Sequence, residues 1–389
     1  MNYDLQLVAA GQVFTGWEEV EIARGLDACA SSFRLVSPER FARNGQPVPF
    51  GPFTPVQLRA AGQPVLTGHT YGYSVDFDAD SHRATIMGRS KTALLVDCTP
   101  DVPAGQYQGY SFEAIVRAVT NIWGITPKIN TNLASTALAD ATLERSETAF
   151  RFLDRYATIS GVLIFDDETG ALVVDNAGDA RANGALKEGV DKGVMRVQFS
   201  YDCSRRYSTY IVKGQAGLAL GAAAGGFGFV SNGAGGVAEA QAAPPVGQVL
   251  TQQRAVANDP GVPLYRPKII IAEGQLTQSQ LQLRANWQRS YAYGHALHAE
   301  VTVPGWFQPD GTLWKVNTLV PVDIPSIGTA EDLLILKTVF KYSTAVATTE
   351  LTIGPVDGAI PSPNLLKTPR RRKGKRGGAV FPWSGVVSA

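Results

Sequence analysis

Asp76, Asp78 and Asp80 alternate along the chain in the way that the first ligands of a calcium-binding loop do. Such a loop also needs a glycine for its sharp turn and a bidentate glutamate at its end. Here Ser81 stands where the glycine belongs and Met87 where the glutamate belongs. We therefore expect these aspartates to form the polar face and the turn of a strand, and not a metal site.

Two other groups of titratable side chains also favour structural roles. His295 and His298 would share one face of a helix and could there hold a metal. On a strand, which we expect here, they point to opposite faces. Asp166, Asp167 and Glu168 precede Gly170, and this composition is typical of a solvent-exposed hairpin turn.

Signatures of catalysis are absent from the sequence. It has only four histidines and no HExxH, GxSxG or Walker A motif. The glycines near 226–228 lack the third glycine of a dinucleotide fingerprint. Cys29, Cys98 and Cys203 are odd in number and form no CxxC pair, so we expect buried free thiols. We predict no enzyme activity, no catalytic residue, no cofactor and no metal.

Charge is distributed unevenly along the 389 residues. Residues 1–363 contain 28 basic and 34 acidic side chains, whereas 364–389 contain seven basic and none acidic. We interpret this basic tail, with the aromatic residues that follow it, as a segment that docks on an acidic neighbouring protein. Nucleic-acid binding and an unordered tail remain alternatives. The candidate partner-binding residues are Lys367, Arg370, Arg371, Arg372, Lys373, Lys375, Arg376, Phe381 and Trp383.

The elements that would position these residues are mainly strands. Apolar and polar residues alternate through most of the first hundred positions, which predicts an antiparallel sheet or barrel. The middle of the chain is α+β. It contains helices over 111–124 and 146–156 and a hairpin over 163–174.

The second half of the chain returns to strands. A Gly- and Ala-rich stretch over 217–262 is predicted to be a flexible insertion. Strands are expected at 195–199, 207–213, 267–271 and 296–304, a helix at 278–293, and further sheet over 313–353. The sequence contains no run of about 18 apolar residues, so it does not predict a membrane helix. The strand pair over 65–88 resembles the pair over 334–355, which indicates two copies of one β-module.

Several segments resemble the Mu-like phage baseplate hub proteins of contractile tails and the related late-control tail proteins. The segment 88–98 fits their pattern GR-x-K-T-x-x-L-V-D-C. The order and spacing of all the matching segments together carry the resemblance, which covers about 1–215 and 263–358. The other matching segments are 11–17, 20–27, 32–35, 303–306, 310–317, 334–336 and 351–353.

The resemblance implies a mainly β fold with α+β, in which two tube-like antiparallel β-barrel domains accompany a mixed α+β domain. It implies a homotrimer that matches the hexameric tail tube to the trimeric spike around a DNA channel. The implied partners are further copies of the chain, the spike, tube or tube-initiator proteins and baseplate wedge proteins. DNA would be only a passenger. The resemblance places the protein in the virion, after assembly in the host cytoplasm.

The expected domains follow from combining the strand pattern with the resemblance. The first tube-like domain is 1–99, and the α+β domain is 100–190 with 263–305. The second tube-like domain is 191–216 with 306–358, the insertion is 217–262 and the basic tail is 359–389. Two alternatives remain, a tail-associated cell-wall hydrolase and a nucleic-acid-binding tail protein. A carboxylate or histidine cluster in a cleft would indicate the first, and salt-sensitive DNA binding the second.

Overall fold

A computed structural model describes most of the chain but not its basic tail. The described residues are 4–38, 51–77, 82–102, 105–130, 138, 141–189, 193–214, 253–272, 276–343 and 346–362. The candidate tail residues and the predicted insertion up to residue 252 lie outside these ranges. Within them, no helix is long and apolar enough to cross a membrane.

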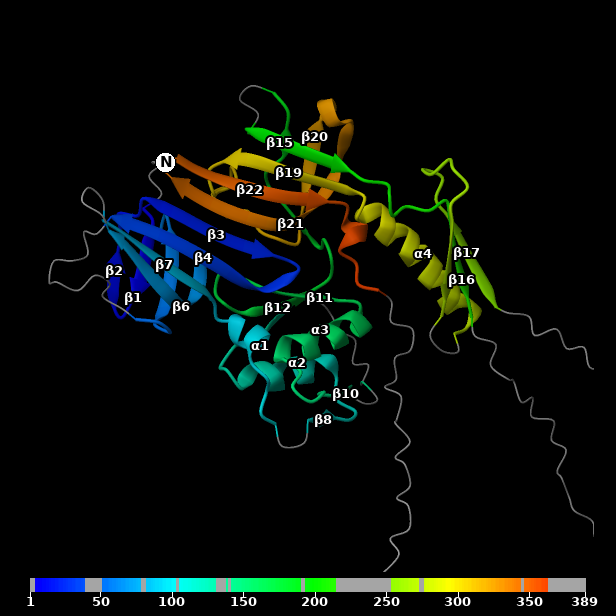
Figure 1. Cartoon of the computed structure of the whole chain (residues 1–389), viewed down its shortest axis with the longest axis horizontal. Helices are drawn as coiled ribbons and strands as arrows, with labels where there is room; N and C mark the ends of the chain where they lie inside the picture. Colours follow the sequence, from blue (N-terminus) through cyan, green and yellow to red (C-terminus); the bar gives the residue numbers. More distant parts are fainter. Residues whose placement is uncertain are drawn as a thin grey trace, which may run out of the picture.

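A single 14-stranded sheet forms the body of the molecule (Figure 1). Three strands lie off the main path of the sheet. They are the two-residue strands β13 (Ala180–Arg181) and β14 (Leu186–Lys187), and β20 (Thr318–Ile324). Along that path the strands are, in order, β15 (Arg196–Tyr201), β19 (Leu297–Pro304), β22 (Val346–Gly354), β21 (Thr329–Ser343), β3 (Glu19–Gly25), β4 (Ala28–Pro38), β7 (His82–Ser90), β6 (Gln63–Phe77), β5 (Pro55–Ala60), β1 (Gln6–Ala9) and β2 (Gln12–Phe14).

The mainly β fold with an α+β part is confirmed, but the expected barrels are not closed. The described strands form an open path from β15 to β2. The reason lies at the centre of the sheet, where β3 pairs with β21 over Lys337–Ser343. This pairing merges the two predicted β regions into one sheet and leaves each of them open. The division into domains stays a prediction.

The sheet contains the same arrangement of strands twice. In the first module, the 15-residue β6 pairs with β5 through its first half and forms a bulged hairpin with β7. In the second, the 15-residue β21 pairs with β20 through its first half and forms a bulged hairpin with β22. β4 and β3 then follow β7 as β19 and β15 follow β22. The topology therefore supports the two-module interpretation of the sequence.

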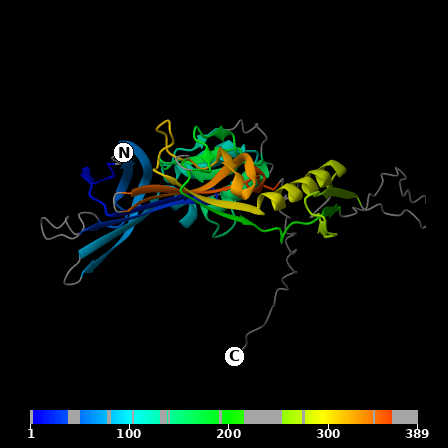
Figure 2. The same cartoon turned by 90° about the horizontal axis from the view of Figure 1, so that it is seen from above.

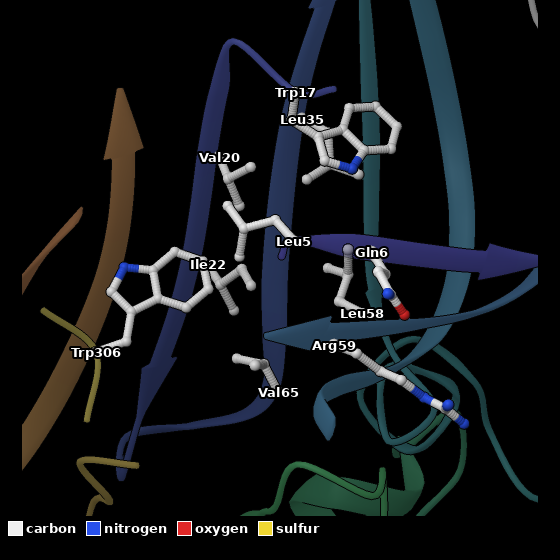
Figure 3. Close-up of a pocket in the computed structure, with 10 residues that line it drawn as sticks. All are labelled: Leu5, Gln6, Trp17, Val20, Ile22, Leu35, Leu58, Arg59, Val65 and Trp306. Atoms are coloured by element: carbon white, nitrogen blue, oxygen red, sulfur yellow. The ribbon is translucent and has the colours of Figure 1, made fainter. Parts of the chain in front are cut away.

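One face of the sheet carries the main hydrophobic core. Inward residues such as Val20, Ile22 and Leu35 alternate with exposed ones, as a strand with one covered face requires. Trp306 is fully buried and donates its indole N–H to the Lys341 carbonyl at 2.9 Å. Figure 3 shows Trp306, Trp17 and Val65 around a cavity of only about 10 Å³. That volume has room for at most one water, so this cavity is too small for a ligand.

An α+β unit (residues 92–179) packs at one end of the sheet (Figures 1 and 2). Ser111 caps its central helix and Thr148 caps the next, which ends at the left-handed Gly161. Both predicted helices and the predicted hairpin are confirmed. The elements are α1 (Ala93–Asp97), β8 (Gln106–Tyr107), α2 (Phe112–Asn121), β9 (Lys128–Ile129), β10 (Ala141–Thr142), α3 (Ala149–Ser160), β11 (Leu163–Asp166) and β12 (Leu172–Asp175).

A satellite unit (residues 204–214, 253–272 and 276–295) extends from the sheet beyond β15. Helix α4 (Gln278–Gly294) covers a three-stranded sheet of β16 (Thr209–Lys213), β17 (Arg254–Asn258) and β18 (Pro267–Ile271). The predicted insertion reached residue 262, but β17 lies within it and pairs with β16. Alternating Ala255 and Ala257 supply the buried side of β17. Two 3-10 turns, η1 (Pro325–Ile327) and η2 (Val356–Gly358), complete the fold.

Candidate functional site

The face of the large sheet opposite the core is a continuous, largely polar surface. One row of cross-strand partners runs from Thr302 through Glu350, Val339 and Ala23 to Ser32 and Arg89. All these side chains are exposed or half-buried. We call this surface the outer sheet face. Its charged residues are Arg34, Arg83, Arg89, Arg196, Lys337, Lys341, Glu19, Glu21, Asp76, Glu300 and Glu350.

Charges on the outer sheet face nearly cancel, and neighbouring strands pair some of them. Arg34 lies 3.1 Å from Glu19, and Lys341 lies 2.7 Å from Glu350. Both pairs are at least two-fifths exposed, so each stabilises the fold by only about 0–1 kcal/mol. The face is therefore a mixed, weakly charged wall. It is unlike a strongly basic nucleic-acid-binding surface.

A shallow hollow of about 310 Å³ opens on this face where β3, β4, β6 and β7 meet. Glycine at position 88 is required here, because a Cβ would collide with the Phe33 ring. The hollow is lined by Glu21, Arg34, Tyr71, Met87 and Arg89, among others. Its carboxylate and guanidinium groups carry opposite charges and are open to solvent. It therefore resembles a contact surface more than a catalytic cleft.

Several strand edges of the sheet have no second partner among the described strands, and the two longest belong to β15 and β6. β15 pairs only with β19, and β6 over Tyr71–Phe77 pairs only with β7. Exposed edges of this kind readily add a strand from another chain. Large side chains lie exposed beside both edges, with Tyr73 48% exposed and Tyr201 51% exposed. These edges are the candidate sites for pairing between chains.

A buried polar network fixes the α+β unit to the sheet. The fully buried Asp166 accepts hydrogen bonds from the Ser31 backbone N–H and Oγ, each at 3.0 Å. Arg24, 3% exposed, donates to Ser31 Oγ at 3.1 Å and to the Val65 carbonyl at 2.9 Å. The sequence predicted a solvent-exposed turn here, but Asp166 is buried. β11 ends against β4 of the large sheet, so Asp166 needs an internal partner there.

The neighbouring carboxylates strengthen this junction. Burial alone would raise the pKa of Glu168, but a 2.8 Å bond to Lys315 and the charge of Arg24 lower it overall. Burial would likewise raise the pKa of Asp167, but hydrogen bonds from Lys128 and Thr169 outweigh burial and lower this pKa overall. A hollow of about 240 Å³ adjoins these residues. Since Asp167 and Glu168 already have cationic partners and Asp166 is bonded by Ser31, the cluster acts as a clamp.

The other candidates of the sequence are dispersed. Asp76 lies on the outer sheet face, and Asp78 and Asp80 lie outside the described residues. We expected both histidines on a strand, but His295 is the C-cap of α4, and its ring centroid lies 4.1 Å from that of Tyr291. His298 does lie on a strand, β19. The described residues contain no group of three or more potential metal ligands.

All three cysteines are free thiols, but only Cys29 is buried. Burial, and then the charges of Asp166 and Asp154, raise the pKa of the Cys29 thiol well above its usual value. This thiol is therefore inert packing beside the junction. Cys98 and Cys203 are half-buried because they lie in connections at the edges of the smaller units.

Three protein-family models match successive parts of the chain. The N-terminal domain of the Mu phage baseplate assembly protein GpP family matches 4–90. The second domain of the gp44-like baseplate hub proteins matches 92–176, and the fourth GpP domain matches 277–362. The first and last of these matches contain the paired hairpins β6–β7 and β21–β22.

Whole-chain relatives agree with these matches. The chain is 28% identical to the baseplate hub protein gp44 of Escherichia phage Mu, over 97% of this chain and 93% of that one. The 43 kDa tail protein of prophage MuSo2 from Shewanella oneidensis has a TM-score of 0.74 and 27% identity, covering 91% and 99% of the two chains. A tail protein from Neisseria meningitidis has a TM-score of 0.71 and 20% identity, covering 94% and 99%.

A two-module sheet with open edges, a polar outer face and these relatives together define a structural phage tail protein. The chain belongs to the Mu-like phage baseplate hub proteins. It is thus a component of the tail baseplate in the virion. The docking role of Lys367 to Arg376, Phe381 and Trp383 stays a proposal, because these residues lie outside the described ranges.

Proposed function

We propose that the chain is a non-catalytic hub that assembles into a homotrimeric ring around a DNA channel. Each chain supplies two β-modules, so three chains supply six. Such a ring presents six similar modules to a hexameric tail tube and three identical subunits to a trimeric spike. Closed cyclic assemblies of this kind use one heterologous interface repeated around the axis.

The observation that carries this proposal is the junction between the two modules. Within the chain, β3 of the first module pairs antiparallel with the second half of β21. In the second module β15 occupies the place of β3, and in the first module β6 occupies the place of β21. Pairing β15 of one copy with β6 of the next would repeat the same junction. Both edges are open over six or seven residues, so their lengths agree.

Ring closure would give the outer sheet face its function. The core occupies one face of the sheet, so the opposite face would line the channel in every copy. Its balanced charges would let DNA pass without the strong phosphate binding that a basic wall would cause. Assembly in the host cytoplasm before incorporation into the virion agrees with three free thiols.

The partners of the ring follow from its two ends. We propose the tail tube or its initiator on one side, the spike on the other and wedge proteins around the rim. The basic tail would dock on an acidic surface of one of these neighbours. DNA would be a passenger in the channel.

Electron microscopy of the purified full chain tests the proposal. We expect particles with three-fold symmetry and a central opening whose wall is a continuous sheet. Particles with two-fold symmetry, or open filaments, would show that β15 and β6 do not close the ring.

A further inference from the structure

We propose that the satellite unit of one copy docks on the α+β unit of the next copy through an apolar and basic sheet face. This inference rests on the proposed ring. It concerns a second contact between neighbouring chains, separate from the pairing of β15 with β6.

The satellite sheet has two unlike faces. One packs Val212, Ala255 and Ala257 against Leu281 and Ala285 of α4. On the other face, cross-strand partners place three apolar residues in a row and two basic residues beside it. These residues are Ile211, Val256 and Ile269 in the row, then Lys213, Arg254 and Ile271.

This second face is exposed to an extent that calls for a partner. Ile269 is 57% exposed and Ile271 is 69% exposed, and Tyr265 in the preceding loop is 90% exposed. Contiguous exposed apolar side chains bounded by polar ones mark interaction sites. We call this surface the satellite face.

Charge identifies the occupant of the satellite face. The described residues of the satellite unit include eight basic residues and one acidic residue. The acidic residue, Asp259, is buried and forms a bidentate pair with Arg206, so it does not reduce the basic surface. The α+β unit contains twelve acidic and five basic residues. Three of the acidic residues, Asp166, Asp167 and Glu168, belong to the clamp, and the other nine still outnumber the basic residues. The two units therefore carry net charges of opposite sign and attract each other.

Strand direction indicates which α+β unit is in reach. Every neighbouring pair from β7 through β4, β3, β21, β22 and β19 to β15 is antiparallel, so β7 and β15 run in the same direction. β7 leads into the α+β unit and β15 leads into the satellite unit, and Figure 1 shows both units at that end of the sheet. Placing β6 of the next copy beside β15 puts its β7 two strands away, about 10 Å. The satellite unit would therefore meet the neighbour's α+β unit.

The α+β unit offers apolar as well as acidic groups for this contact. Tyr110 is 51% exposed and Ile122 is 44% exposed, at the two ends of the segment that contains α2. An apolar centre surrounded by complementary charge is the ordinary anatomy of a protein interface.

Zero-length carbodiimide crosslinking of the assembled full chain tests the contact, because it joins amines to carboxylates. Lys213 and Lys268 are the two lysines of the satellite unit. Chains labelled with ¹⁵N and unlabelled chains are unfolded, mixed and reassembled, and the mass of the sample is measured before crosslinking. We expect peptides of mixed isotope that join Lys213 to carboxylates of residues 92–179. Lys268 pairs with Tyr210 on the α4 side of the satellite sheet, so it should form fewer such links. In the control Lys213→Arg, the links from position 213 disappear while the assembly persists.

A charge-reversal pair supplies a second readout. Lys213→Glu with Arg254→Glu should weaken trimer association about tenfold or more. Arg289→Glu, on α4 at the other side of the satellite sheet, should change it less than about twofold. A trimer without mixed-isotope links, or one unaffected by the double reversal, would overturn the satellite contact alone. A sample whose mass is that of one chain would overturn both this contact and the proposed ring.

Discussion

We expect the replacement of Val197 with proline to leave the chain folded but to weaken the proposed trimer strongly. Asp202 donates its backbone N–H to the Ala296 carbonyl at 2.9 Å, which fixes the alternation along β15. In an antiparallel pair, alternate amides point toward and away from the partner strand. The amide of Val197 therefore points away from β19, toward the open edge. Proline removes that donor and places its ring against any added strand.

We expect the trimer dissociation constant of Val197→Pro to rise about 100-fold or more, measured by sedimentation across a concentration series. The free energy of unfolding of the monomer should fall by only about 1 kcal/mol, because edge strands tolerate proline. Val197→Thr keeps both the amide and the β-branched shape, so it should assemble normally. A Val197→Pro chain that assembles as tightly as the unchanged chain contradicts pairing at this edge.

We expect removal of the Asp166 carboxylate to weaken the attachment of the α+β unit to the sheet. In Asp166→Ala the Ser31 amide loses its acceptor inside the protein, and the buried Arg24 loses the anion at the end of its chain of hydrogen bonds. An unpaired buried amide costs about 1–3 kcal/mol, and breaking a buried charge network costs about 3–5 kcal/mol. We therefore expect a loss of about 3 kcal/mol.

Denaturant unfolding of the full chain measures this loss. Glu113→Ala is the matched control, since Glu113 pairs with Arg117 on the exposed surface of α2 at 2.9 Å. It should cost less than about 0.5 kcal/mol. Equal losses for the two variants would show that the junction does not depend on Asp166. The α+β unit bears the proposed acidic surface, so its fixed position also matters for contact between copies.

Local sequence patterns predicted the helices well but not the junction between units. Ser111 precedes an amphipathic segment and Thr277 precedes the segment predicted as a helix over 278–293, and both cap helices in the structure. Capping is a local interaction, so its signal lies within a few residues. The network of Arg24, Ser31 and Asp166 joins positions up to 142 apart in number, and no local pattern reveals such partners.

One sequence signal could have indicated this network. Val20, Ile22 and Arg24 occupy the same inward phase of one strand, so Arg24 had to be buried with a polar partner. The open sheet was unpredictable for a different reason. The alternation that indicates a strand does not say which strand pairs with it, and pairing of β3 with β21 spans more than 300 residues. The repeat of β6–β7 in β21–β22 was the best clue to the architecture.

Light scattering of the purified full chain measures the central claim most directly, since it counts the chains in the particle. One chain has a mass of 41.5 kDa. We predict a particle of three chains, either alone or as a complex of three chains with a trimeric spike protein. A particle of one chain that persists at high concentration and in the presence of the spike would contradict the hub proposal.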